Sequence, residues 1–95
     1  MKFIINKDWG GFSVPEAMQE HLHCGRYPHG WEDISIRTNE DFIAWVLDHD
    51  AETSLAVVEI SDYATDWRIE EYDGMETVWT VVDGKMIPAP IVKRA

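Results

Sequence analysis

Residues 67–79 read WRIEEYDGMETVW, with two alternating strand-like runs on either side of an Asp-Gly pair. Such a pair favours a two-residue type I′ turn, because Gly accepts a positive φ and Asp tolerates one. A turn of that length sets the register of the two strands. Glu71 then faces Glu76 near the turn, and Arg68 faces Trp79 at the other end of the hairpin. The stretch therefore predicts a β-hairpin whose tip holds two like charges side by side, which lowers stability.

A second Asp-Gly pair, at residues 83 and 84, extends this hairpin into a three-stranded meander whose last strand covers residues 85–87. Side chains alternate between the two faces of a sheet. The face expected against the core carries Trp67, Ile69, Val78, Val82 and Ile87, and the reverse face carries Arg68, Glu70, Tyr72, Met75, Thr77, Trp79, Val81 and Met86. The reverse face is too apolar for plain exposure, so we expect a helix or a partner to cover part of it.

Two further strands are predicted upstream of the meander. Residues 2–6 read KFIIN, a short apolar run that ends where Asn-Lys-Asp and Gly-Gly follow. Residues 55–60 read LAVVEI, which is apolar almost throughout and rich in β-branched side chains. A strand buried on both faces has this composition, so the second run is expected in the middle of a sheet. Pro88 and Pro90 then predict an extended, edge-like tail.

The remaining periodic segments predict two helices. In the first, Ser13 and Glu16 have the spacing of a capping box. Its expected buried face holds Val14, Ala17, Met18, His21 and Leu22. For the second helix, over about residues 39–49, Thr38 is the expected N-cap. Residues 34–36 are expected to form a short extended piece before it.

The length and composition fit one small domain. Ninety-five residues with 45% hydrophobic content suffice for one core, so residues 1–95 are expected to fold together. The predicted class is α+β, with an N-terminal strand and two helices packed on a mostly antiparallel sheet that ends in the meander. No apolar run approaches about 18 residues, and no charged-then-apolar leader is present. With a single cysteine, Cys24, these features predict a cytoplasmic protein without an internal disulfide.

The formal charge of −10 is concentrated in the middle of the chain. Residues 39–76 hold twelve acidic side chains against the single base Arg68, for a charge of −11 in that segment. Such a field repels nucleic acid and anionic membranes, so neither is an expected partner, and it attracts basic protein surfaces. The alternative is a solvated acidic surface that keeps a small protein soluble.

Two acidic surfaces that include aromatic side chains are the candidate partner-binding sites. On the second helix, Asp41 and Asp48 line up beside Trp45. On the hairpin, the candidates are Glu70, Glu71, Tyr72, Asp73, Met75, Glu76 and Trp79. Charge steers a basic partner toward such surfaces, and aromatic rings supply affinity. For Trp45, the alternative is a ring that covers the edge of the core.

Residues for metal binding or catalysis are few. His23, Cys24 and His29 have ligand-type side chains, but a metal site would require the first helix to end early so that they converge with an acid such as Glu20. Packing and loop roles are the simpler interpretation. No phosphate-binding or nucleophile motif is present, and a solvated hairpin tip lacks the burial that carboxylate catalysis requires. We therefore expect a non-catalytic protein without a cofactor, with a small metal-binding protein or enzyme as the alternative.

Five segments of the chain carry a resemblance. They are residues 2–6 (KFIIN), 10–13 (GGFS), 37–39 (RTN), 58–62 (VEISD) and 67–76 (WRIEEYDGME). In them the chain resembles a widespread group of small uncharacterised proteins encoded by phages and prophages. It differs from the usual pattern of that group by Trp9 in place of Tyr, by Ser61 in place of Pro, and by its tail over residues 80–95.

The resemblance implies a phage accessory protein in the cytoplasm of a bacterial host, and it supplies no catalytic residue or cofactor. Phages deploy many small acidic proteins that bind and block host defence or nucleic-acid-handling proteins, some by imitating the charge of DNA. The leading hypothesis is therefore a non-catalytic acidic module that binds the basic surface of a host or phage protein, with inhibition as its effect. A homo-oligomeric structural accessory protein that associates through the Trp79 face is a further alternative.

Overall fold

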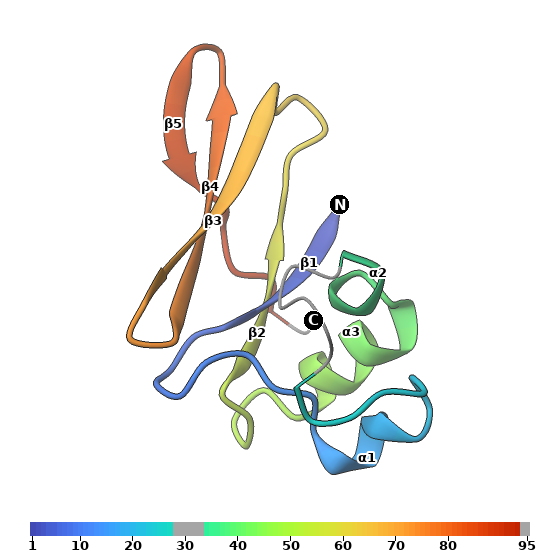
Figure 1. Ribbon diagram of the computed structural model, residues 1–95. Helices are drawn as coiled ribbons and strands as arrows, with labels where there is room; N and C mark the ends of the chain where they lie inside the picture. The colour runs from blue at the N-terminus through green and yellow to red at the C-terminus, as the bar shows by residue number, and fades with distance from the viewer. Residues whose placement is uncertain (28–33, 94–95) are drawn as a thin grey trace.

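A computed structural model describes residues 1–27 and 34–93 of the chain. The described residues form three short helices and five strands, arranged as Figure 1 shows. In chain order these are β1 (Lys2–Asn6), α1 (Glu16–Gln19), α2 (Ile34–Arg37), α3 (Glu40–Asp48), β2 (Leu55–Glu59), β3 (Asp66–Tyr72), β4 (Met75–Val82) and β5 (Lys85–Pro88). The predicted α+β class is confirmed, with two antiparallel sheets and the expected meander at the end of the chain.

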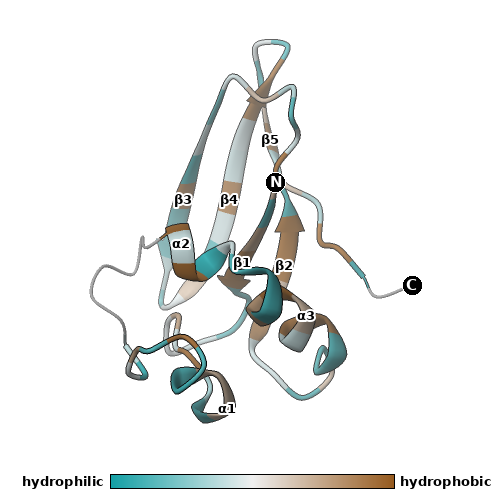
Figure 2. Cartoon of the chain, turned by 90° about the vertical axis from the view of Figure 1, so that its right-hand side faces the viewer, coloured by the Kyte–Doolittle hydropathy of each residue, from teal (hydrophilic) through white to brown (hydrophobic). Residues whose placement is uncertain are grey.

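β1 and β2 pair antiparallel and form the middle layer of the molecule. Figure 1 shows the helices on one side of this sheet and the meander on the other. Ile4 and Val57 belong to a core on the helix side. Phe3 and Val58 belong to a second core, on the side of Val78 in β4. Both faces of β2 are therefore buried, which explains a sequence that is hydrophobic along nearly its whole length (Figure 2).

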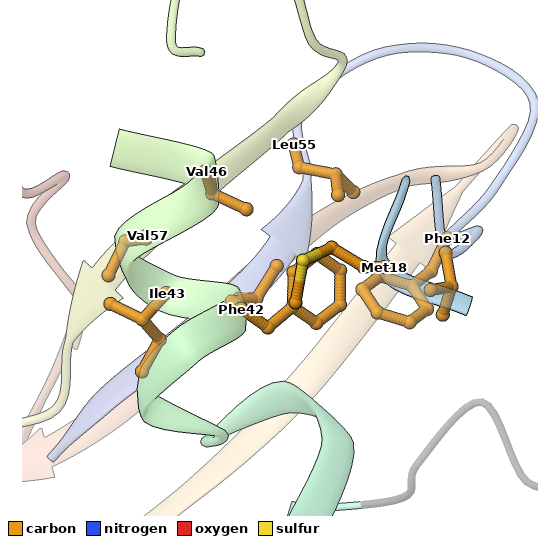
Figure 3. Close-up of a cluster of buried hydrophobic side chains, with 9 residues drawn as sticks. Phe12, Met18, Phe42, Ile43, Val46, Leu55 and Val57 are labelled. Atoms are coloured by element: carbon orange, nitrogen blue, oxygen red, sulfur yellow. The ribbon is translucent and has the colours of Figure 1, made fainter. Parts of the chain in front are cut away.

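The helix-side core connects the loop before α1 to α3. Its buried members are Ile4, Phe12, Val14, Met18, Phe42, Ile43, Val46, Leu55 and Val57, most of which are labelled in Figure 3. The centroids of the Phe12 and Phe42 rings lie 6.3 Å apart. Because Phe12 follows β1 while Phe42 lies on α3, this contact fixes the position of the glycine-rich loop, residues 7–12, relative to the helices.

The meander has the strand order and register that its two Asp-Gly pairs predict. β4 lies between β3 and β5, both pairings are antiparallel, and Glu71 faces Glu76. Asp73 and Gly74 have φ angles of 50° and 86°, which are the signs that a type I′ turn requires. The predicted two-residue turn is therefore confirmed at the tip of the β3–β4 hairpin.

The far end of the meander departs from the expected core face. Trp67 and Ile69 pack against the second core, as predicted. Ile87, however, is 44% exposed, and Val82 is half-buried and belongs to neither core. Figure 1 shows the reason, since the β4–β5 turn projects beyond the middle sheet and meets no second layer there.

Residues 34–37 form a helical turn, α2, so the extended piece expected at residues 34–36 is wrong. Thr38 closes this turn, because its Oγ1 donates to the carbonyl oxygen of Ile34 at 2.5 Å. The N-cap of α3 is instead Asn39, whose side chain accepts from the N–H of Phe42 at 3.0 Å. Asn caps a helix at least as well as Thr. Because Thr38 already closes α2, its neighbour Asn39 acts as the N-cap of α3.

The first helix is shorter than predicted, because α1 covers four residues only. Pro15 occupies the N-cap position, and no side chain makes a capping hydrogen bond there, so the capping box expected at Ser13 is wrong. Proline disfavours the helical conformation of the residue before it. A helix that begins at Ser13 would place Val14 in that disfavoured conformation, which explains the later start.

The tail after β5 lies along β2 on the side away from β1. Val92 N–H donates to the carbonyl oxygen of Val57 at 2.8 Å, and Glu59 N–H donates to that of Pro90 at 3.0 Å. β2 therefore lies between β1 and the tail, in the central position that the sequence predicts. None of the described helices has the length or the hydrophobicity that crossing a bilayer requires.

Candidate interaction site

The tip of the β3–β4 hairpin is fixed against the glycine-rich loop. Asn6 at the end of β1 donates from Nδ2 to the carbonyl oxygens of Gly74 and Asp8, at 2.7 and 2.5 Å. A Cβ at position 74 would lie 2.7 Å from the backbone nitrogen of Gly10 and closer still to that of Gly11. Both the positive φ and this close approach require glycine at position 74. The tip is therefore a rigid element.

A buried ion pair joins the hairpin to α2. Arg37 Nη1 and Nη2 donate to Glu76 Oε1 and Oε2 at 2.8 and 2.9 Å. The two residues are 0% and 6% exposed. The guanidinium also lies over the ring of Phe12, 3.9 Å from its centroid, in a cation–π contact. Removal of either partner would leave an uncompensated charge in the interior.

The same two side chains cover the free edge of β1. Alternate residues of β1 point their backbone groups away from β2, and these include Ile4 and Asn6. Arg37 Nη1 donates to the carbonyl oxygen of Ile4 at 3.0 Å, and Glu76 Oε1 accepts from the N–H of Asn6 at 2.9 Å. The ion pair thus supplies hydrogen bonds that a neighbouring strand would otherwise make.

This burial corrects the predicted place of Glu76 on a partner-binding surface. The repulsion expected between Glu71 and Glu76 is offset, because Arg37 neutralises the inner carboxylate. The outer one, Glu71, is exposed, and its Oε1 accepts from the N–H of Gly74 at 2.6 Å. Strand alternation places Glu76 on the face of the buried Val78, but it places the facing Glu71 there as well, so the sequence carries no signal for the difference.

The acidic tip, which we define as Glu70, Glu71, Tyr72, Asp73 and Met75, is the exposed part of the predicted hairpin surface. Tyr72 is 74% exposed and Met75 is 41% exposed. Three carboxylates and two apolar side chains therefore lie at one end of a hairpin whose inner side is fixed. Exposed apolar groups with a charged rim are typical of protein-binding surfaces.

A pocket of about 350 Å³ lies beside the acidic tip. Its walls are Gly10, Gly11, Phe12, Tyr27, Glu71 and Glu76. Tyr27 is 71% exposed, and Trp9, next to the pocket in sequence, is 77% exposed. A carboxylate beside an aromatic ring fits the cationic side chain of a Lys or Arg. No local pattern in the sequence indicates that Tyr27 belongs here, because the pocket is formed by segments far apart in the chain.

The residues predicted on the second helix are not part of this site. Asp41, Trp45 and Asp48 lie on α3, on the opposite side of the middle sheet from the meander (Figure 1). Asp41 Oδ2 lies 2.8 Å from Nε2 of His21, an exposed side chain that was expected to be buried. Trp45 is half-buried against the helix-side core and stacks on His49, with 4.1 Å between ring centroids. Trp45 therefore covers the edge of the core, which was the alternative interpretation.

Trp79 is less accessible than the acidic tip. It lies on the reverse face of β4, opposite Arg68, and is half-buried. Its Nε1 is buried and has no hydrogen-bond acceptor among the described residues. Tyr72 and Met75 are therefore the exposed apolar members of the predicted hairpin surface.

The alternative metal site is only partly within the described residues. His29 lies outside them. His23 and Cys24 line an open pocket together with Glu16 and Glu20. Over residues 1–27 and 34–93, no three His, Cys, Asp or Glu side chains come close enough together to hold a metal ion.

Comparison of the chain with known protein families, with curated proteins and with solved structures finds no match. Function is therefore inferred from the geometry of the acidic tip and its pocket.

Proposed function

We propose that the protein is a non-catalytic interaction module whose acidic tip binds a basic surface on a partner protein. The observation that supports this most directly is the combination of exposure and rigidity at the tip. Glu71 and Tyr72 are exposed, while the turn beside them is held by Asn6 and by the glycine-rich loop. A preorganised surface loses little conformational entropy when a partner binds.

The charge of the chain gives such a surface a preferred class of partner. The net charge is −10, and residues 39–76, which contain the tip, carry −11 against a slightly positive remainder. Opposite charge on a partner raises the rate of encounter, whereas buried rings and apolar groups slow dissociation. In this proposal a Lys or Arg of the partner enters the pocket between Tyr27 and Glu71, and Tyr72 packs beside it.

The resemblance to phage-encoded proteins suggests which basic surfaces are relevant. A protein that handles nucleic acid has a basic surface for phosphate groups. An acidic module that occupies this surface competes with the nucleic acid, so inhibition of a host defence or nucleic-acid-handling protein is the expected effect. In this proposal the module acts in the cytoplasm of a bacterial host and does not bind nucleic acid itself.

The test is affinity capture from a bacterial lysate with two variants of equal net charge. Glu70→Lys with Glu71→Lys reverses two charges at the acidic tip. Glu20→Lys with Glu52→Lys reverses two exposed acids elsewhere and serves as the matched control. Glu76 is unsuitable for this purpose because it is buried.

A partner that is captured by the wild type and by the control but not by the tip variant supports the proposal. Equal loss in both variants would show that only net charge matters. Capture that does not change in the tip variant would reject the acidic tip as the binding site.

A further inference from the structure

Two sheet edges are closed by other parts of the chain, and a third carries a proline. The outer edge of β2 pairs with the tail, where Val92 N–H donates to Val57. The free edge of β1 is covered by Arg37 and Glu76. On β5, the backbone of Pro88 points toward the outer edge of the sheet, and proline has no N–H to offer another strand. Proteins close edges in these ways to prevent unwanted strand pairing.

The outer edge of β3 differs from these three. A two-residue turn leaves Tyr72 hydrogen-bonded to β4, so the backbone groups of Ile69 and Glu71 point the other way. In the described part of the chain, no hydrogen bond joins these outward backbone groups to another segment. At the next outward position, Trp67 N–H is satisfied within β3 by Asp66 Oδ1 at 2.8 Å. Among the described residues, no segment pairs with the half of the edge nearest the acidic tip.

A pocket of about 260 Å³ lies beside this edge, lined by Ile34, Trp67, Arg68 and Ile69. Ile34 of α2 is 50% exposed, although it faces this pocket. A strand added to β3 would direct every second side chain toward the inner face of the sheet, where Trp67 and Ile69 lie. An apolar side chain at that position would fill the pocket and cover Ile34.

We propose that an extended segment of a partner protein, in which basic and apolar residues alternate, pairs with the outer edge of β3 as an additional strand. Backbone hydrogen bonds give affinity in this mode, and alternate side chains give specificity. Apolar side chains of the segment occupy the pocket beside Ile34, and basic ones lie on the reverse face near Asp66 and Glu70. The inference rests on the proposed function and specifies how the basic partner binds.

Charge favours this occupant over a second copy of the chain. A copy would bring another charge of −10 to an edge that already carries Asp66, Glu70 and Glu71 against Arg68. A basic segment is attracted to the same edge.

The experiment measures amide hydrogen exchange by NMR, with a capped peptide of alternating lysine and valine that is as long as β3. At a peptide concentration ten times the dissociation constant, exchange of the Ile69 and Glu71 amides is expected to slow about tenfold. The control peptide has the same sequence with N-methyl groups on alternate residues, which removes donors from its pairing edge. It is expected to bind more weakly and to leave both exchange rates within about twofold of the free protein.

Chemical shift changes at the acidic tip without slower exchange at Ile69 and Glu71 would overturn strand addition and leave the proposed function standing. No shift change anywhere with the first peptide would reject both. Protection of these amides that increases with protein concentration in the absence of peptide would show that a second copy occupies the edge, which also overturns the inference.

A pair of variants at one position separates the backbone from the side chain. Glu71→Pro removes the outward N–H, and Glu71→Ala removes the carboxylate while the N–H is kept. Strand addition predicts that the proline variant weakens binding of the peptide at least about tenfold more than the alanine variant. Equal effects would assign the binding to the carboxylate alone. If the proline variant does not fold, the exchange measurement on the wild type still decides the question.

Discussion

Glu71 and Glu76 face each other across the same rung of the β3–β4 hairpin, yet they lie in opposite environments. Glu76 is buried and accepts hydrogen bonds from Arg37 and from the N–H of Asn6, whereas Glu71 is exposed at the edge of a pocket. The inner carboxylate connects the hairpin to the rest of the fold. The outer one is available to a partner. Two chemically equal groups on the same face of the hairpin thus acquire different roles, because Glu76 lies on the central strand β4 within reach of Arg37, whereas Glu71 lies on the edge strand β3.

The largest loss of stability is expected from removing Glu76 or its partner Arg37. Glu76→Ala leaves the Arg37 guanidinium charged and buried, so the free energy of unfolding should fall by about 3–5 kcal/mol. Arg37→Ala should cost a similar amount, because it leaves the carboxylate unpaired. Chemical denaturation of each variant measures the change.

The double variant, Arg37→Met with Glu76→Met, tests whether the two buried charges are coupled. It removes both charges, so it should lose less stability than the sum of Arg37→Met and Glu76→Met measured singly. It should still be less stable than the wild type, since Ile4 and Asn6 lose their edge hydrogen bonds. Strictly additive losses would contradict a coupled buried ion pair.

The two Asp-Gly turns provide the next comparison, because only one of them touches another segment. Gly74→Ala and Gly84→Ala both place alanine at a positive φ, which costs about 1–2 kcal/mol. At Gly74 the new Cβ also meets the backbone of Gly10, whereas at Gly84 nothing lies within 4 Å. Gly74→Ala should therefore cost at least about 1 kcal/mol more in thermal or chemical denaturation. Equal costs would mean that the hairpin tip is not held by the glycine-rich loop.

A smaller loss of stability is expected from substitutions at the start of α3. Asn39→Ala removes the capping acceptor for Phe42 N–H and should lower the free energy of unfolding by about 1 kcal/mol. Thr38→Ala removes a hydrogen bond within the turn of α2, on a partly exposed side chain, and should cost less. A larger loss of stability for Thr38→Ala than for Asn39→Ala, in the same denaturation assay, would identify Thr38 as the N-cap, as the sequence alone predicted.

The features predicted correctly from the sequence are those that local chemistry determines. The Asp-Gly pairs set the turn type, the turn length sets the register, and the apolar run of β2 indicates a strand buried on both faces. The features missed depend on residues distant in the chain. Arg37 and Glu76 are 39 positions apart, and no local pattern indicates that one neutralises the other. The pocket has the same origin, because Tyr27 and Glu71, which both line it, lie in segments far apart in the chain.

The smallest change in stability, and the most informative about function, is expected at the outer side of the pair. Glu71→Gln keeps an oxygen that accepts from Gly74 N–H, and it removes only an exposed charge. The free energy of unfolding should therefore stay within about 0.5 kcal/mol of the wild type. Binding of the lysine–valine peptide should weaken, and its dependence on salt should become shallower, because one charge at the site is lost. Titrations at two salt concentrations measure both effects. A loss of stability as large as that of Glu76→Ala, with unchanged salt dependence, would show that both carboxylates of the pair are structural.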